Sequence, residues 1–162
     1  MNKKNGFTLV ELLVVIAIIA VLAGAVLIAI NPVAMMQKSR DAKRLSDLDQ
    51  LVRAMHIGLV EGEITLTAMV TTGDSLSGTQ VVTGGGWVSY TVPTGKTGLG
   101  KYISTLPIDP VNTGTNVYSY KSTLTDFEFN AVLESLDNTT KMSTDGGTAA
   151  AVYEVGTKLT IL

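Results

Sequence analysis

One uninterrupted apolar run dominates the start of the chain. Every residue from 12 to 30 is Leu, Val, Ile, Ala or Gly. As a helix rising 1.5 Å per residue, this run is about 28 Å long, close to the hydrocarbon thickness of a bilayer. Its length favours a membrane-spanning helix over the core helix of a soluble protein. We therefore expect this segment to insert into a membrane.

Glu11 places a single carboxylate immediately before this run. An ionised carboxylate in an apolar setting is costly unless it has a partner or reaches water. The first possibility is a positive group nearby in the same or another chain. The second is that Glu11 lies at the level of the lipid headgroups and is solvated there.

Residues 31–59 have a different pattern, in which apolar side chains recur at steps of three and four. Asn31-Pro32 interrupts the helix first, because Pro removes a backbone hydrogen bond and disfavours helix at the residue before it. Apart from this interruption, we expect one helix from Phe7 to Leu59. It is apolar on all sides in 7–30 and amphipathic in 31–59. Asp49 and Arg53 are spaced to pair on its exposed face. The apolar stripe consists of Leu45, Leu48, Val52, Met55 and Leu59.

Residues 60–162 have strand-like patterns between turn-forming residues. Gly62 ends the helix, and a Thr-, Gly- and Ser-rich connection follows at 64–83. A hairpin at 122–126 joins two of the strands. We expect a small antiparallel sheet with one face on the helix stripe and the other in solvent, and hence an α+β fold. Strands are predicted at 87–92, 116–121, 127–133 and 152–162.

Composition narrows the possible functions. The 162 residues include no Cys and one His, which excludes disulfides, Cys-ligated zinc, thiol catalysis and histidine metal clusters. His56 follows the stripe residue Met55 and is predicted to be a partly buried structural residue. Residues 60–162 contain five lysines and ten acids, so no broad nucleic-acid surface is expected there. With no catalytic constellation present, we expect a protein that is not an enzyme.

The residues before the apolar run form a short basic leader. Lys3 and Lys4 favour a cytoplasmic location for this end. No small-x-small cleavage site follows the run, so a conventional secretory signal is not indicated. The sequence GFTLVE at 6–11, between the leader and the apolar run, resembles the class III signal of type IV pilins and pseudopilins. The resemblance implies cleavage by a prepilin peptidase between Gly6 and Phe7, and N-methylation of Phe7.

The resemblance also suggests a role for Glu11. Cleavage creates a positive α-amino group on Phe7, four residues before Glu11. That amine can pair with Glu11 of its own chain or, in a staggered filament, with Glu11 of a neighbouring subunit. In the family the intersubunit pairing is thought to set the register during assembly. Family members often have a Pro and a Gly where the helix loosens in filaments, and here Gly24 and Pro32 are the helix-weakening residues.

A basic cluster lies in the second half of the helix, at Lys38, Arg40, Lys43 and Arg44. Three interpretations apply: a solvated helix face, a membrane-surface contact, or an intersubunit salt-bridge patch. Because the resemblance implies a filament in which this helix is packed on several sides, we favour pairing with acidic residues of neighbouring subunits.

A second resemblance lies further along the chain. The sequence LPIDP at 106–110 is similar to a region of the major pseudopilins of type II secretion, although Val111 replaces the Trp that often follows. A nearby loop binds calcium in those proteins. Here the acids do not form an Asp-x-Asp-x-Asp-Gly loop, and we expect no cofactor. The calcium candidates are Asp126, Asp137 and Asp145, with Glu128 a further nearby acid.

The resemblance implies a structural subunit, the major pilin of a type IV pilus, that polymerises through its N-terminal helix. Its regions are then a leader at 1–6, a transmembrane and filament-core helix at 7–30, an amphipathic half at 31–59 and a β-rich head at 60–162. The implied partners are further copies of the chain, the prepilin peptidase, and an assembly platform with its motor. The subunit is first a single-pass precursor in the cytoplasmic membrane and is then assembled into a filament on the cell surface. The alternatives are a major pseudopilin of a type II secretion system and a membrane-anchored binding domain that never polymerises.

Overall fold

The structure is a computed structural model, which describes residues 7–162 of the chain. The chain forms two compact units, which divide after Met36. The leader 1–6, and with it the Gly6 side of the expected cleavage site, lies outside the described residues.

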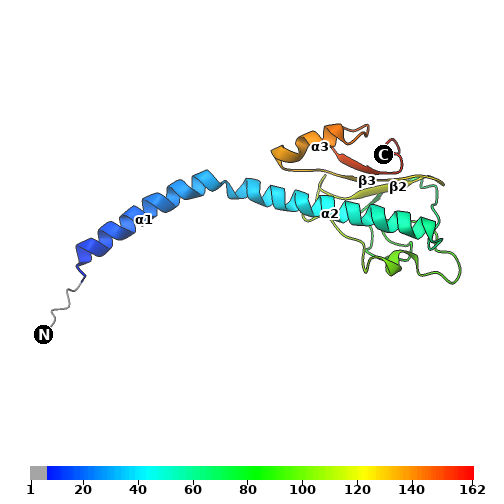
Figure 1. Cartoon of the computed structure of the whole chain (residues 1–162), viewed down its shortest axis with the longest axis horizontal. Coiled ribbons are helices and arrows are strands. Elements are labelled where there is room, and N and C mark those ends of the chain that lie inside the picture. Colours follow the sequence, from blue (N-terminus) through cyan, green and yellow to red (C-terminus); the bar gives the residue numbers. More distant parts are fainter. Residues whose placement is uncertain (1–6) are drawn as a thin grey trace. The chain divides into compact units, whose positions relative to one another are not determined.

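The first unit contains helix α1, Leu9–Ile30 (Figure 1). Leucine and alanine favour helix, and a helix satisfies every backbone group internally, as a bilayer requires. By length and composition, Leu9–Leu27 can cross a membrane. At 1.5 Å per residue the 22-residue helix is about 33 Å long.

Helix α1 is capped by Asn31, which adopts a left-handed conformation with φ of 45°. The Asn31 side-chain oxygen then accepts a hydrogen bond from the N–H of Ala34 at 3.3 Å. Pro32 is the first residue of helix α2, Pro32–Val60, where its missing N–H has no cost. The predicted interruption at Asn31-Pro32 is therefore the point where one helix ends and a second helix begins, with Pro32 as its first residue. In this single chain α1 continues through Gly24, since one glycine weakens a helix by only about 1 kcal/mol, and loosening at Gly24 in a filament stays a prediction.

The second unit, 37–162, combines most of α2 with a four-stranded antiparallel sheet of order β1-β2-β3-β4. The fold is α+β, as the sequence predicts. The strands are β1 Gly73–Asp74, β2 Ser119–Ser122, β3 Phe127–Ala131 and β4 Tyr153–Gly156. Short helical elements complete the unit: 3₁₀ helices at Gly98–Lys101 and Leu136–Asn138, and helix α3 at Thr139–Thr144.

Three of the four predicted strands are present as β2, β3 and β4, and the predicted hairpin joins β2 to β3. The strand predicted at 87–92 is wrong. That segment makes only isolated bridges, Gly85 to Ser89 and Thr91 to Thr65, although Trp87, Val88 and Tyr90 are buried in the core. Strand β1 and helix α3 were not predicted.

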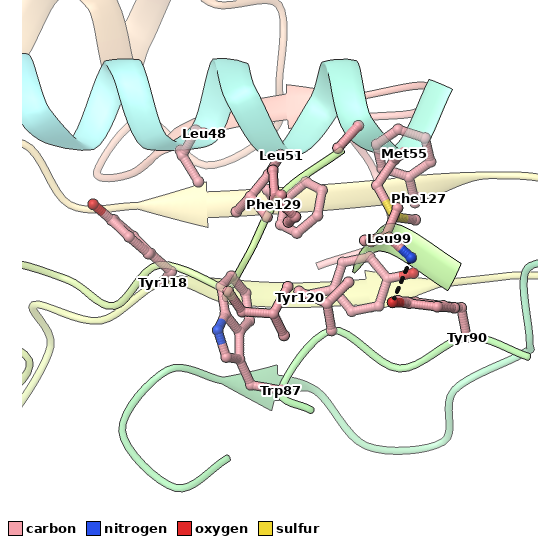
Figure 2. Close-up of a cluster of buried hydrophobic side chains, with 14 of the residues drawn as sticks. Leu48, Leu51, Met55, Trp87, Tyr90, Leu99, Tyr118, Tyr120, Phe127 and Phe129 are labelled. Atoms are coloured by element: carbon pink, nitrogen blue, oxygen red, sulfur yellow. Dashed lines mark hydrogen bonds between the residues drawn. The ribbon is translucent and has the colours of Figure 1, made fainter. Parts of the chain in front are cut away.

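The core of the second unit lies between α2 and one face of the sheet. Figure 2 shows aromatic rings of β2 and β3 packed beneath leucines and a methionine of α2. The rings of Tyr120 and Phe129 have centroids 4.8 Å apart. The fully buried apolar residues of α2 are Leu48, Leu51 and Met55. Leu45, Val52 and Leu59 of the predicted stripe are half-buried, so the stripe is rotated slightly from the prediction.

The opposite face of the sheet is also covered, which corrects the expectation that it faces solvent. Every residue of β3 is buried, including Glu128 and Asn130. Both point away from Phe127 and Phe129, because side chains alternate along a strand. Segments 145–149 and 157–162 supply backbone contacts to this polar face.

Candidate functional site

The N-terminal segment begins with a capping box at the start of α1. Thr8 is the N-cap, and its hydroxyl oxygen accepts a hydrogen bond from the N–H of Glu11 at 3.2 Å. In return, Oε2 of Glu11 accepts the backbone N–H of Thr8 at 2.9 Å and the Thr8 hydroxyl at 2.7 Å. The pattern Thr-x-x-Glu before an apolar run is the sequence signature of this cap. The partners predicted for Glu11 from the sequence were an amine of the same or another chain, or solvent, and the Thr8 cap was missed.

The capping box leaves part of Glu11 available. Both of its hydrogen bonds are made by Oε2, and within the described residues Oε1 has no hydrogen-bond partner. Phe7 directly precedes the cap, and its side chain is 73% exposed. The segment therefore presents an available carboxylate oxygen close in sequence to the residue whose amine cleavage would release.

Beyond the cap, α1 presents apolar side chains on all sides. In the span Leu9–Leu27 none of the residues is buried within the structure. A helix that is apolar all round belongs inside a membrane or among other helices. The α1 surface therefore needs lipid or protein around it.

The predicted basic cluster has a different environment from the one expected. Arg44 is fully buried and donates two hydrogen bonds to Asp109, at 2.6 Å from Nε and 2.9 Å from Nη2. It also donates to Asp41 at 3.1 Å and to Glu134 at 2.8 Å. The predicted intersubunit role of Arg44 is wrong, because the side chain is buried and its hydrogen bonds all go to carboxylates of its own chain. The sequence pattern did not show partners 65 and 90 residues away.

The acids around Arg44 bind backbone as well. Asp41 accepts the N–H groups of Glu134 and Ser135 at 2.9 and 2.8 Å. Burial alone would raise the pKa of Asp41, but these hydrogen bonds and Arg44 outweigh it and lower the pKa. Burial alone would also raise the pKa of Glu134, but hydrogen bonds from Arg40 and Arg44 lower that pKa overall. The network therefore fastens α2 to two distant loops through ionised groups.

The other three cations of the cluster also have partners within the chain. Arg40 pairs with Glu134, Lys43 with Asp47 at 3.1 Å, and Lys38 with Asp137 at 2.5 Å. The lysine side chains remain more than half exposed. A contact with a neighbouring subunit stays a prediction for Lys38 and Lys43. The predicted Asp49–Arg53 pair is confirmed.

The calcium candidates lie in three different settings. Asp126 accepts the hydroxyl of Thr125 in the β2–β3 hairpin, and Asp137 pairs with Lys38. Asp145 follows α3 and accepts the N–H groups of Gly147 and Glu154. Among the described residues no group of three or more His, Cys, Asp or Glu side chains is arranged to hold a metal. His56 is exposed rather than partly buried and its ring stacks edge-on against Phe127, with centroids 5.4 Å apart.

Comparison with known proteins adds one finding. Residues 1–27 match the protein-family model described as the prokaryotic N-terminal methylation motif. Searches of curated proteins and of solved structures gave no match to the chain. The match covers the leader, the capping box and most of α1, and α1 carries the exposed apolar surface.

The chain therefore carries the class III signal of type IV pilins, followed by an apolar N-terminal helix. This motif supports a pilin-like or pseudopilin protein, a structural class made as a membrane-anchored precursor. It implies processing by a prepilin peptidase and assembly into a filament.

Proposed function

We propose that this chain is the major subunit of a type IV pilus and that α1 is the helix through which it polymerises. The observation that carries the proposal is the methylation motif joined to a helix that is exposed and apolar on all sides. In the membrane, lipid surrounds that helix. In a filament, packing against the α1 helices of other copies replaces the lipid.

Glu11 has a defined part in this process. Cleavage after Gly6 frees the Phe7 amine, and the Oε1 atom of Glu11 in an adjacent subunit accepts it. Two opposite charges in an apolar core attract strongly, and each removes the cost of burying the other. Each subunit has one Glu11 carboxylate and one Phe7 amine. Pairing between neighbours therefore fixes the axial register between subunits. A motor then extracts each registered subunit from the cytoplasmic membrane into the surface filament.

The test is the variant Glu11→Ala in cells that make the chain together with a prepilin peptidase and assembly platform. We expect at least a tenfold loss of filaments by electron microscopy, while cleavage after Gly6, followed by mass spectrometry, continues. Glu61→Ala is the matched control, because Glu61 is an acid of the second unit paired with the exposed Lys101. It should leave the filament yield unchanged.

An unchanged filament yield in Glu11→Ala would overturn the register role. If the protein is instead a membrane-anchored binding domain that never polymerises, neither the unmodified chain nor Glu11→Ala should form filaments. The variant should then insert into the membrane more readily. The experiment therefore separates the two classes of function.

A second candidate is the major pseudopilin of a type II secretion system, which is favoured by the sequence LPIDP at 106–110. In the structure Asp109 of that sequence accepts Arg44 and the N–H of Val111, so it is a structural residue of the second unit. Both candidates share α1 and its processing. Immunogold labelling distinguishes them: long fibres outside the cell support the pilus, and short fibres confined to the periplasm support the pseudopilin.

A further inference from the structure

The polar face of the sheet buries two carboxyl groups next to each other. Glu128 on β3 is fully buried, and Glu154 on β4 is 2% exposed. In the β3–β4 register Glu154 lies opposite Asn130, and Glu128 is two residues further along on the same face. The two side chains are therefore diagonal neighbours across the β3–β4 pair. Pairs of buried carboxyl groups are uncommon inside proteins because two like charges repel strongly there.

Each carboxyl group uses one oxygen to hold a separate segment of backbone. Oε2 of Glu128 accepts the N–H groups of Ile161 and Leu162 at 2.7 and 3.1 Å. Oε2 of Glu154 accepts the N–H of Ala149 at 2.8 Å. Gly147 packs so closely on the Glu154 carboxyl that a side chain there would collide with it. The two acids therefore fasten the segments 145–149 and 157–162 over the sheet.

The remaining oxygens have no donor among the described residues. Oε1 of Glu128 and Oε1 of Glu154 are both buried without a hydrogen-bond partner, and so is Oδ1 of the neighbouring Asn130. A buried acceptor left unpaired costs about 1–3 kcal/mol, and more when it is charged. This face of the sheet thus holds acceptors in excess of donors, and one proton between the two Oε1 atoms would satisfy both.

We propose that Glu128 and Glu154 share one proton and that this proton locks the segments 145–149 and 157–162 onto the sheet. Glu154 is the protonated member and donates to Oε1 of Glu128. Oε2 of Glu128 keeps its two backbone N–H donors, so its Oε1 is the atom that receives the Glu154 proton. When the shared proton is lost, two adjacent buried carboxylates repel each other and the locked segments open.

The charged groups around the pair agree with this assignment. On β2, Lys121 lies opposite Glu128 in the register. At the end of α3, Asp145 accepts the N–H of Glu154 and disfavours a second negative charge there. Burial, the nearby Glu128 carboxyl and Asp145 raise the pKa of Glu154 above its ordinary value. The remaining titratable side chains on the covering elements, Lys141 and Lys158, are exposed.

A divalent cation fits this place less well than a proton. Calcium takes six to eight oxygen ligands. Here the two Oε2 atoms are committed to backbone N–H groups, which leaves two carboxylate oxygens and one amide oxygen, all buried. A proton needs only the two carboxyl Oε1 atoms, one as donor and one as acceptor.

The sign of the pH dependence follows from the raised pKa. A group whose pKa is raised by folding contributes stability that is present at low pH and lost as the pH rises through the folded-state value. The lock should therefore be closed in mildly acidic solution and weaken as the pH rises. This is the opposite of the dependence expected for Asp41 and Glu134, whose pKa values are lowered.

The test is amide hydrogen exchange of the full chain in nonionic detergent, with each rate normalised to the unfolded rate at the same pH. Between pH 4 and pH 8 we expect the protection of the Ala149, Ile161 and Leu162 amides to fall at least tenfold. In Glu154→Gln the side-chain amide donates permanently to Glu128, so the same amides should change less than twofold. Glu61→Gln, an exposed control, should behave like the unmodified chain.

An equal pH dependence in Glu154→Gln and the unmodified chain would overturn the proposal. If that variant does not fold, carbon-13 NMR of the glutamate carboxyls in the unmodified chain decides instead. Sharing predicts two separated titrations for the pair. Two independent titrations at ordinary glutamate values contradict it, and so does protection of the same amides by millimolar calcium at pH 8, which would identify a cation site.

Discussion

Helix α1 and the second unit of the chain place their charges in opposite ways. α1 has one carboxylate in an apolar surface, and the partners of that carboxylate within the described residues are the N–H and hydroxyl groups of Thr8. In the second unit, Arg44 is fully buried, yet it contacts three carboxylates of its own chain. The charged core of the second unit is thus complete within one chain, whereas α1 leaves Glu11 and its apolar surface to be completed by other molecules.

This difference shows where to look for assembly. A buried, fully paired network stabilises a fold and offers little to a neighbour, because breaking it leaves unpaired charges behind. By contrast, an exposed apolar helix contributes stability only when lipid or protein covers it, and one oxygen of its carboxylate is still available for a partner. Substitutions on each side of this contrast should therefore have different consequences.

The largest effect is expected for Arg44→Met in the second unit. The substitution keeps much of the side-chain volume but leaves Asp41, Asp109 and Glu134 without their shared cation. Breaking a buried ion pair in this way costs about 3–5 kcal/mol. The free energy of unfolding, measured by urea titration of the full chain in nonionic detergent with tryptophan fluorescence of Trp87, should fall by that amount.

Arg53→Met is the matched control, because Arg53 pairs with Asp49 on the exposed face of the same helix. Exposed pairs four residues apart contribute only about 0.3–0.5 kcal/mol. Equal losses for the two variants would show that the second unit does not depend on its buried network.

The second unit should also be sensitive to acid. The pKa values of Asp41 and Glu134 are lowered in the folded chain, so their contribution is complete above the pKa values of the unfolded chain and lost as the pH falls through the folded values. We expect the urea midpoint to decrease progressively below about pH 4. In Asp41→Asn this decrease should be smaller, although the variant starts less stable. If the urea midpoint of Asp41→Asn falls with pH as steeply as that of the unmodified chain, other carboxyl groups cause the effect.

The smallest effect is expected at the cap of α1. Thr8→Ala removes the hydroxyl that accepts the N–H of Glu11. Loss of an N-cap costs about 1 kcal/mol, or roughly a fivefold fall in hydrogen-exchange protection of the Glu11 amide in detergent. Thr8→Ser retains the hydroxyl and should retain most of the protection. If both variants exchange alike, the capping box does not contribute.

The sequence predicted much of the fold because the relevant signals are local. The apolar run predicts α1, and alternation predicts β2 and β3. The prediction failed at 87–92, where Val88, Tyr90 and Val92 alternate with polar residues as in a strand. The segment packs into the core but makes only isolated bridges, because no neighbouring strand among the described residues runs beside it. β1 has two residues and α3 six, mostly Thr and Ser, so neither carries a periodic pattern.

The site was predictable only in part, for the same reason. The motif around Phe7 and Glu11 is contiguous and so was visible, and the Thr8 cap was available from its spacing. The partners of Arg44 come from loops 65 and 90 residues away, and no pattern in the sequence joins them. One signal did exist: Asp41 and Arg44 continue the helical spacing of the buried residues Leu48, Leu51 and Met55 toward the N-terminal end of α2, which placed charged residues on the buried face.

Processing and assembly through the N-terminal helix are the properties on which the proposed function depends most. Mass spectrometry of the N-terminal peptide from purified filaments tests them most directly. We predict a peptide that begins at Phe7 and carries one additional methyl group on its amine. Filaments whose subunits begin at Met1, with the leader intact, would contradict the proposed function.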